Sequence, residues 1–189
     1  LGSIYTEDSQ YEDAINNFKK VIELGRSDLA ATADIAIADI YVKQDQLDLA
    51  LQTYKKIAGE YGNLVGLVYP KIADIYNKLG NYDEAMDFYQ KSLEVVPVKE
   101  MSNIQFKIAE VKKTQGKLQE AIEEYLKVTY LYSQDNGLVI KALLRVAAIY
   151  EDKENFKEAL NIYKRITSMA VDEAKYAQER IDWIKIHIK

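Results

Sequence analysis

The sequence contains no cysteine and a single histidine, which removes most of the chemistry that these side chains carry. Without thiols there is no disulfide, no thiolate nucleophile and no cysteine metal site, and a zinc site would need carboxylates almost alone. Proline and glycine are also scarce, with two and eight residues, and no low-complexity run occurs. This scarcity disfavours linkers, disorder and turn-dense β architecture. We therefore predict an all-α protein that needs no metal and no cofactor.

Long apolar runs and an excess of positive charge are missing as well. No apolar run reaches the roughly 18 residues that a membrane-spanning helix requires, so we expect no direct membrane insertion. The net charge of −5 repels phosphate backbones, which argues against a nucleic-acid partner. A chain without cysteine suits reducing and oxidising compartments alike, so the localisation stays open between the cytoplasm and a bacterial periplasm. Because the chain starts at Leu1 rather than at methionine, we expect a fragment of a longer protein.

No group of side chains has a recognisable catalytic spacing, so we predict no catalytic residue. The glycine-rich stretch at 59–66 lacks a preceding strand and the Gly-Lys-Ser/Thr ending of a phosphate-binding loop, and we interpret it as a turn between helices. Acid pairs such as Glu123 and Glu124 are typical of solvated helix faces. The protein is not expected to be an enzyme.

What the sequence does contain is an alanine that recurs five times. The copies are Ala14, Ala50, Ala85, Ala121 and Ala159. Successive copies are 36, 35, 36 and 38 residues apart, and an aromatic residue follows each copy by four positions. Residues four apart share one face of a helix. The aromatic residues are Phe18, Tyr54, Tyr89, Tyr125 and Tyr163.

An earlier element repeats with the same period. A small residue stands twelve positions before each recurring alanine, and a turn lies between them, so each repeat is predicted to be a pair of helices. A tyrosine follows the small residue by three positions, except in the fourth copy, which has Lys112. We expect the small residues to let helices approach closely and the rings to fill the space between repeats. The small residues are Gly2, Ala38, Ala73, Ala109 and Ala147.

Over about residues 1 to 170, this pattern resembles the tetratricopeptide repeat (TPR). Asp45 and Glu154 depart from it, because they stand where other copies have Gly80 and Gly116. The resemblance implies a right-handed α-solenoid of antiparallel helix pairs, the TPR superhelix, whose first helices line a concave groove. The residues that carry it best are Tyr69, Ile72, Ala73, Tyr76, Ala85, Tyr89 and Pro97.

We predict a single TPR array over residues 1–189. Its repeat units lie at approximately 1–25, 27–61, 63–97, 98–133 and 137–170, and a capping helix follows at 171–188. Trp183 and Ile186 lie off the main apolar stripe of the capping helix. Either they pack on the edge of the cap, or they form a second contact patch for a partner or for self-association.

The groove residues are predicted from first-helix positions that packing does not require. A basic ladder runs two positions before the small residue, and an acidic ladder runs one position after it. Lys71 and Asp74 are three positions apart, as are Lys107 and Glu110, so each pair can neutralise itself within one helix. The alternative, that these charges bind a partner, stays open.

The fifth repeat unit, 137–170, breaks the acidic ladder. Ala148 replaces the acid there, so we expect Arg145, with Lys141 one turn earlier, to be the least compensated positive spot and suited to a carboxylate of a partner. An apolar row runs beside the ladders, and Phe106 is its expected anchor for a bound peptide.

These features predict a non-catalytic scaffold that binds a protein or peptide in its groove, with rigid stacking that lowers the ordering cost of binding. Two alternatives stay open. The segment could be the regulatory or substrate-docking arm of an enzyme located elsewhere in the full-length chain, or a self-associating structural scaffold.

Overall fold

The structure, a computed structural model, describes residues 10–25, 27–169 and 171–188. Every regular element in these ranges is a helix, with no strand among them, which confirms the predicted all-α class. The chain divides between Val96 and Pro97 into two compact units. The predicted first-repeat positions Gly2 and Tyr5 lie outside the described residues.

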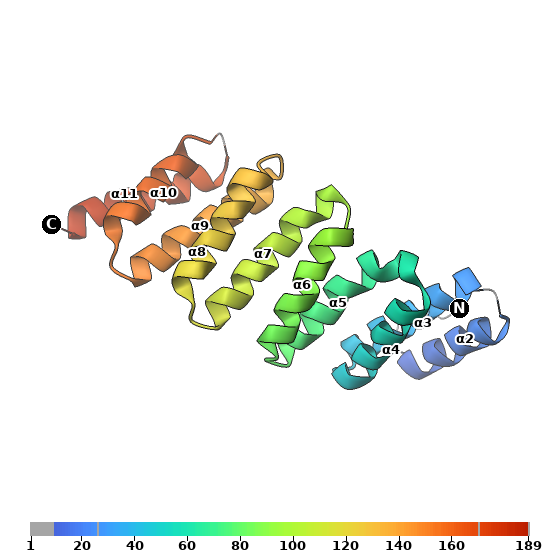
Figure 1. Ribbon diagram of the computed structural model, residues 1–189. Helices are drawn as coiled ribbons and strands as arrows, with labels where there is room; N and C mark the ends of the chain where they lie inside the picture. The colour runs from blue at the N-terminus through green and yellow to red at the C-terminus, as the bar shows by residue number, and fades with distance from the viewer. Residues whose placement is uncertain (1–9, 26, 170, 189) are drawn as a thin grey trace. The chain divides into compact units, whose positions relative to one another are not determined.

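The described part of unit 1, residues 1–96, contains one helix followed by two helix pairs, coloured blue to green in Figure 1. A short 3₁₀ turn at Gly62–Leu64 joins the two pairs, within the stretch that was predicted as a turn. Gly66 follows this turn, and a Cβ added there would lie 3.0 Å from the carbonyl oxygen of Val95. The absence of a side chain at Gly66 therefore allows the start of α5 (Val65–Lys78) to lie close to the end of α6 (Tyr82–Val95). The helices are α2 (Tyr11–Glu23), α3 (Ser27–Lys43), α4 (Leu47–Glu60), α5 (Val65–Lys78) and α6 (Tyr82–Val95).

Within its described residues, unit 2 (97–189) contains two helix pairs followed by one more helix, coloured yellow-green to red in Figure 1. Asp135 caps the second pair, because its side chain accepts a hydrogen bond from the Leu138 amide at 3.2 Å. The same carboxylate accepts from the buried Ser102 hydroxyl at 2.8 Å and so ties the two pairs together. The helices are α7 (Val98–Thr114), α8 (Leu118–Leu131), α9 (Asn136–Asp152), α10 (Phe156–Thr167) and α11 (Glu173–His187).

The predicted packing of small residues and rings is confirmed in both units. All four described first helices, α3, α5, α7 and α9, bury their recurring alanine completely, as do the second helices α4, α6, α8 and α10. The tyrosine four residues after the second-helix alanine is at most 2% exposed in each case. Burial of one such side chain contributes about 1.5–3 kcal/mol. These tyrosines are Tyr54, Tyr89, Tyr125 and Tyr163.

Lys112 stands where the other first helices carry a tyrosine. Its ammonium nitrogen lies 2.7 Å from Oε2 of Glu120, in the first turn of α8. This hydrogen bond lowers the pKa of Glu120. The ion pair of Lys112 with Glu120 therefore joins α7 to α8 at the position where other repeats have a tyrosine ring.

The turns between paired helices share one backbone conformation. Gly80 and Gly116 have φ values of 78° and 73°, and Asp45 and Glu154 adopt the same left-handed region with φ of 60° and 55°. The turn therefore keeps its left-handed backbone conformation even where Asp45 or Glu154 takes the place of glycine. Left-handed geometry costs a residue with a Cβ roughly 1–2 kcal/mol.

Each first helix buries a triplet of residues with the spacing i, i+4, i+7, and α11 buries a triplet with the same spacing. Its members are Ala177, Ile181 and Ile184, and they pack against α9 and α10. The triplets of the four first helices are Ala33, Ile37 and Ile40; Val68, Ile72 and Ile75; Ile104, Ile108 and Val111; and Ala142, Val146 and Ile149.

Candidate functional site

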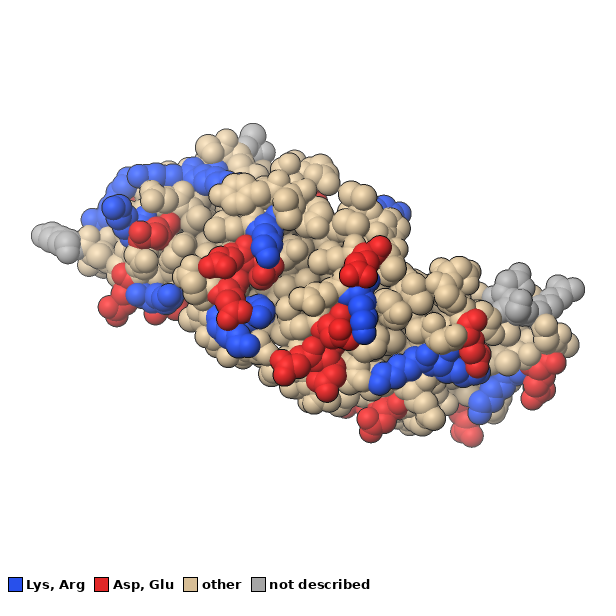
Figure 2. Space-filling model, viewed as in Figure 1, with Lys and Arg blue, Asp and Glu red and all other residues tan. Residues whose placement is uncertain are grey.

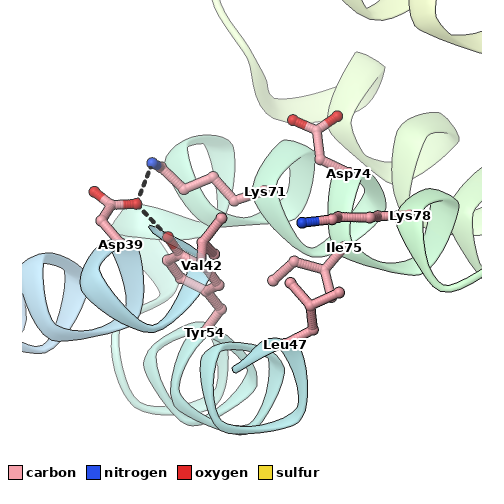
Figure 3. Close-up of a pocket in the computed structure, with 8 residues that line it drawn as sticks. All are labelled: Asp39, Val42, Leu47, Tyr54, Lys71, Asp74, Ile75 and Lys78. Carbon is pink, nitrogen blue, oxygen red and sulfur yellow. Dashed lines mark hydrogen bonds and ion pairs between the residues drawn. The ribbon is translucent and has the colours of Figure 1, made fainter. Parts of the chain in front are cut away.

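A carboxylate in unit 1 is held by two helices other than its own. Asp39 on α3 accepts a hydrogen bond from the hydroxyl of Tyr54 on α4 and pairs with Lys71 on α5, whose Nζ lies 2.6 Å from Oδ1 (Figure 3). We call this arrangement of a first-helix acid, the tyrosine of the same pair and the base of the next first helix a rung. It connects one helix pair to the next.

Unit 2 contains a second rung with the same geometry. Oε1 of Glu110 on α7 accepts from the Tyr125 hydroxyl at 2.5 Å and from Nε of Arg145 on α9 at 2.9 Å. The prediction that Arg145 is the least compensated positive spot is therefore wrong. The sequence argument considered partners within one helix, whereas the partner lies 35 residues away on the preceding first helix.

The final rung of unit 2 uses a different acid. Ala148 leaves the ladder position empty, and Glu151, one turn later on α9, accepts from the Tyr163 hydroxyl at 2.5 Å. Arg180 on α11 binds both oxygens of Glu151 through Nε and Nη2. Burial alone would raise the pKa of Glu151, but the hydrogen bonds from Arg180 and Tyr163 outweigh burial and lower it.

The four buried tyrosines of the second helices are held as neutral phenols. The Tyr89 hydroxyl on α6 likewise donates to Oδ1 of Asp74 on α5 at 2.6 Å. Burial first, and then the neighbouring carboxylate, raises the pKa above its ordinary value near 10 in Tyr54, Tyr89, Tyr125 and Tyr163. These hydroxyls donate hydrogen bonds and do not act as bases.

A pocket of about 210 Å³ opens between α3, α4 and α5 in unit 1. Figure 3 shows the Asp39 rung on one side and the Lys78 side chain extending over the pocket beside Ile75 and Leu47. The pocket therefore combines an apolar floor with charged groups at its edge. Its lining residues are Asp39, Val42, Leu47, Tyr54, Lys71, Asp74, Ile75 and Lys78.

Two predicted groove residues, Lys71 and Asp74, line this pocket. The sequence argument did not single out Lys78 or Val42. Each could have been found from helix geometry, because Lys78 lies four positions after Asp74 and Val42 lies three after Asp39, on the same helix faces. Leu47 and Tyr54 come from the second helix, which the argument did not assign to the groove.

The other predicted groove residues lie in unit 2. Phe106 is partly buried and packs against the core of unit 2, with its ring centroid 5.3 Å from that of Tyr125. Lys107 is half-buried beside it on α7. Lys141 is exposed on α9, one turn before Arg145, and makes no ion pair with any described residue. Their role in binding stays a prediction.

The predicted second patch lies on α11. Trp183 is 42% exposed and Ile186 is 70% exposed. The Trp183 ring stacks on His187 with centroids 4.7 Å apart, and the Arg180 guanidinium carbon lies 4.6 Å from the same ring. The indole therefore has a defined position although it faces solvent.

The described side chains and helices provide neither a cluster for a metal ion nor a membrane span. No group of three or more His, Cys, Asp and Glu residues in the described ranges is arranged to hold a metal ion. None of the described helices is both long and apolar enough to span a membrane. On the face drawn in Figure 2, basic and acidic side chains lie beside one another in small groups, as the rungs require. What the arrangement offers a ligand is apolar contact and charge-assisted hydrogen bonds.

Two family models match the chain. The model of the tetratricopeptide repeat-like domain matches residues 2–113, and the model of the soluble NSF attachment protein matches residues 97–178. Among curated proteins, the chain is 25% identical over 162 residues to Protein KINESIN LIGHT CHAIN-RELATED 2 of Arabidopsis thaliana. The match covers 76% of this chain and 24% of that protein, so the chain spans about a quarter of the length of this relative.

Solved structures share the fold. The crystal structure of MamA has a TM-score of 0.71 at 19% identity, with 95% of both chains covered. YrrB, described as a TPR protein with an unusual peptide-binding site, has a TM-score of 0.64 at 23% identity, with 94% of this chain and 88% of that chain covered. These likenesses confirm the predicted fold class, an α-solenoid of antiparallel helix pairs.

Proposed function

Since the chain belongs to the tetratricopeptide repeat-like family, we propose that it is a non-catalytic scaffold that binds a peptide segment of a partner protein along its first helices. The observation that supports this proposal is the pocket of unit 1, which is lined by Lys71 and Asp74, two of the residues predicted to face the groove. The peptide-binding site named for YrrB supports the proposal by analogy of fold.

The pocket is suited to one side chain of a peptide. Its volume of about 210 Å³ is smaller than the roughly 300–1,000 Å³ of sites that enclose drug-sized ligands. Val42, Leu47 and Ile75 supply apolar contact, and the charged ends of Asp39 and Lys78 lie where the main chain or a flanking polar group would pass. An apolar side chain in an extended segment fits this combination.

The site is held in shape before any partner arrives. Asp39 is fixed by Tyr54 and Lys71, and the Lys71 ammonium also lies 5.7 Å from the centre of the Tyr54 ring. Because these side chains are already ordered, binding does not have to immobilise them, which otherwise costs about 0.5–1.5 kcal/mol for each flexible side chain. Preorganisation is therefore the proposed mechanism of affinity.

The test begins with peptides selected from a random-sequence display library against the wild-type chain. Their affinities are then measured by fluorescence anisotropy for the wild type, Lys78→Glu and the control Lys91→Glu. Both lysines pair with an aspartate at 2.6 Å, and their side chains are similarly exposed, at 55% and 48%. Each substitution removes a similar surface ion pair. Only Lys78→Glu changes the pocket, because Lys91 does not line it.

We expect selected peptides to lose roughly tenfold or more in affinity for Lys78→Glu, about 1.4 kcal/mol, and little for Lys91→Glu. Circular dichroism would verify that both variants stay helical. A selection that yields no binding peptide, or peptides that bind all three proteins equally, would refute the assignment of the pocket.

A further inference from the structure

An uncharged segment lies at the end of α8. Residues 128–133 have the sequence Val-Thr-Tyr-Leu-Tyr-Ser, and no acid or base stands between Lys127 and Asp135. Valine, threonine and tyrosine are weak helix formers and favour β-strands. The repeat nevertheless holds most of this segment in a helix, because α8 ends only at Leu131. Local propensity and the observed structure therefore disagree at this point of the fold.

The first two residues of the segment are held in the helix by burial. Val128 is fully buried in the core of unit 2, and Thr129 is 3% exposed. The Thr129 hydroxyl also donates a hydrogen bond to the carbonyl oxygen of Leu126 at 2.9 Å. Packing therefore overrides the strand preference of these two residues.

The next two residues face solvent. Tyr130 is 68% exposed and Leu131 is 63% exposed. The guanidinium carbon of Arg165 lies 5.3 Å from the centre of the Tyr130 ring, but most of that ring stays uncovered. The last turn of a helix lacks intrahelical partners for its carbonyl groups, so it opens more readily than the middle of the helix. The exposed end of the segment is therefore the part that leaves the helix first.

The same positions in the repeats of unit 1 carry a glutamate. Tyr130 and Leu131 stand nine and ten positions after the recurring alanine of their repeat. Two repeats of unit 1 have Glu23 and Glu94 nine positions after this alanine, and the repeat between them has Glu60 ten positions after it. A charge in a β-prone segment opposes pairing between chains. The segment at the end of α8 lacks this protection.

We infer that residues 128–133 pair as a β-strand with the same residues of a second copy of this chain when the end of α8 opens. In an extended chain, successive side chains point to opposite faces. One face of the segment then carries the valine and both tyrosines, and the other carries threonine, leucine and serine. Uncharged segments of this composition stack in register, and each backbone group pairs with the copies above and below it.

The composition of the segment selects a second copy as the partner. In an in-register stack, each side chain lies on the same side chain of the next copy, so rings stack on rings and a charged residue would repel itself. Residues 128–133 contain no charge that would do so. The inference does not depend on the proposed function, because it concerns the opened end of α8 and not the pocket of unit 1.

The test follows assembly of the whole chain by thioflavin T fluorescence in urea, below the midpoint of unfolding. Variants are compared at equal populations of unfolded protein, set by circular dichroism, because assembly depends on the population of the open form. The main variant is Leu131→Glu, and its matched control is Leu24→Glu. Leu24 also stands ten positions after the recurring alanine and is 77% exposed. Both substitutions therefore remove an exposed leucine at the same repeat position and add one negative charge.

We expect the wild type to form fibres that bind thioflavin T and diffract at about 4.7–4.8 Å, the spacing of paired strands. Leu131→Glu should lengthen the lag phase roughly tenfold or more, since a nucleus of several copies brings several like charges together. Leu24→Glu should leave the lag phase unchanged. Tyr130→Glu is a second variant with the same expectation as Leu131→Glu, because α2 and α6 form with Glu23 and Glu94 at this repeat position.

Mass spectrometry of the protease-resistant core of the fibres locates the paired segment. We expect this core to contain residues 128–133. A core at any other segment would overturn the inference, and the sharpest rival is 166–171, which occupies the matching positions of the next repeat and is also uncharged. Equal lag phases for Leu131→Glu and Leu24→Glu, or a wild type that forms no assemblies that bind thioflavin T, would overturn it as well.

Discussion

Alkaline conditions should destabilise this protein through four buried tyrosines of its second helices, and Tyr125 is the clearest of them. Its side chain is fully buried and donates to Glu110, and burial followed by this hydrogen bond raises its pKa in the folded protein. In the unfolded chain the phenol ionises near pH 10. Since the folded pKa is the higher one, the stability contribution is fully present below about pH 10 and is lost as the pH rises from there towards the folded pKa.

The size of the effect follows from proton linkage. At about pH 11, ionisation of one phenol lowers the free energy of the unfolded chain by RT ln(1 + 10), or about 1.4 kcal/mol. The pKa is raised in Tyr54, Tyr89 and Tyr163 as well, so the four together lower the free energy of unfolding by about 5–6 kcal/mol. This loss is comparable with the roughly 5–15 kcal/mol that stabilises a typical domain.

The assay is urea unfolding followed by circular dichroism at about pH 8 and about pH 11. At the lower pH, Tyr125→Phe should be less stable than the wild type by about 1.5–3 kcal/mol, because a hydrogen bond to a charged group is lost. At the higher pH this difference should shrink by about 1.4 kcal/mol, since the variant has one phenol fewer to ionise on unfolding. Lysine deprotonation affects both proteins alike and cancels.

Tyr130→Phe is the matched control, because this tyrosine side chain is 68% exposed on α8. Its difference from the wild type should stay constant between the two pH values. If the difference for Tyr125→Phe also stays constant, the buried phenol does not keep its proton and the argument from burial fails.

Two further predictions concern the backbone. Glu154→Gly should raise the free energy of unfolding by about 0.5–1 kcal/mol, because glycine relieves the left-handed φ of 55°, and thermal denaturation should show no such gain for Glu154→Ala. Gly66→Ala should destabilise unit 1 by about 1–3 kcal/mol, because the new Cβ would lie 3.0 Å from the Val95 carbonyl oxygen. Gly59→Ala, with nothing within 4 Å of the added Cβ, should be neutral or stabilising, and equal effects of the two substitutions would contradict the close approach.

The positions and pairing of the helices were predictable because burial imposes a spacing on the sequence. A fully buried alanine and a tyrosine four positions later recur once in each repeat. Each further copy strengthens the prediction of a helix at the matching positions of the other repeats. The left-handed turns at Asp45 and Glu154 were not predicted, because the hydrogen bonds of the turn select the backbone conformation even without glycine.

The partners of the charged residues were predicted less well. Sequence spacing suggested that Lys71 would pair within its own helix, whereas it reaches Asp39 on the preceding first helix. Arg145 reaches Glu110 in the same way. Such pairs depend on the distance and angle between neighbouring first helices, which a one-dimensional pattern does not contain. Lys78 could have been identified from the sequence as a residue on the same helix face as Asp74, but the pocket that it lines is formed by three helices and was not predictable from one helix.

The rungs of unit 2 also link the free energies of its helices. Glu110 on α7 is held by α9, and Glu151 on α9 is held by α11. If α11 detaches, Glu151 loses its counter-charge and α9 becomes easier to open, which in turn weakens the restraint on Glu110. Local opening of these three helices is then cooperative, so a contact that holds α11 in place would slow amide exchange as far away as α7.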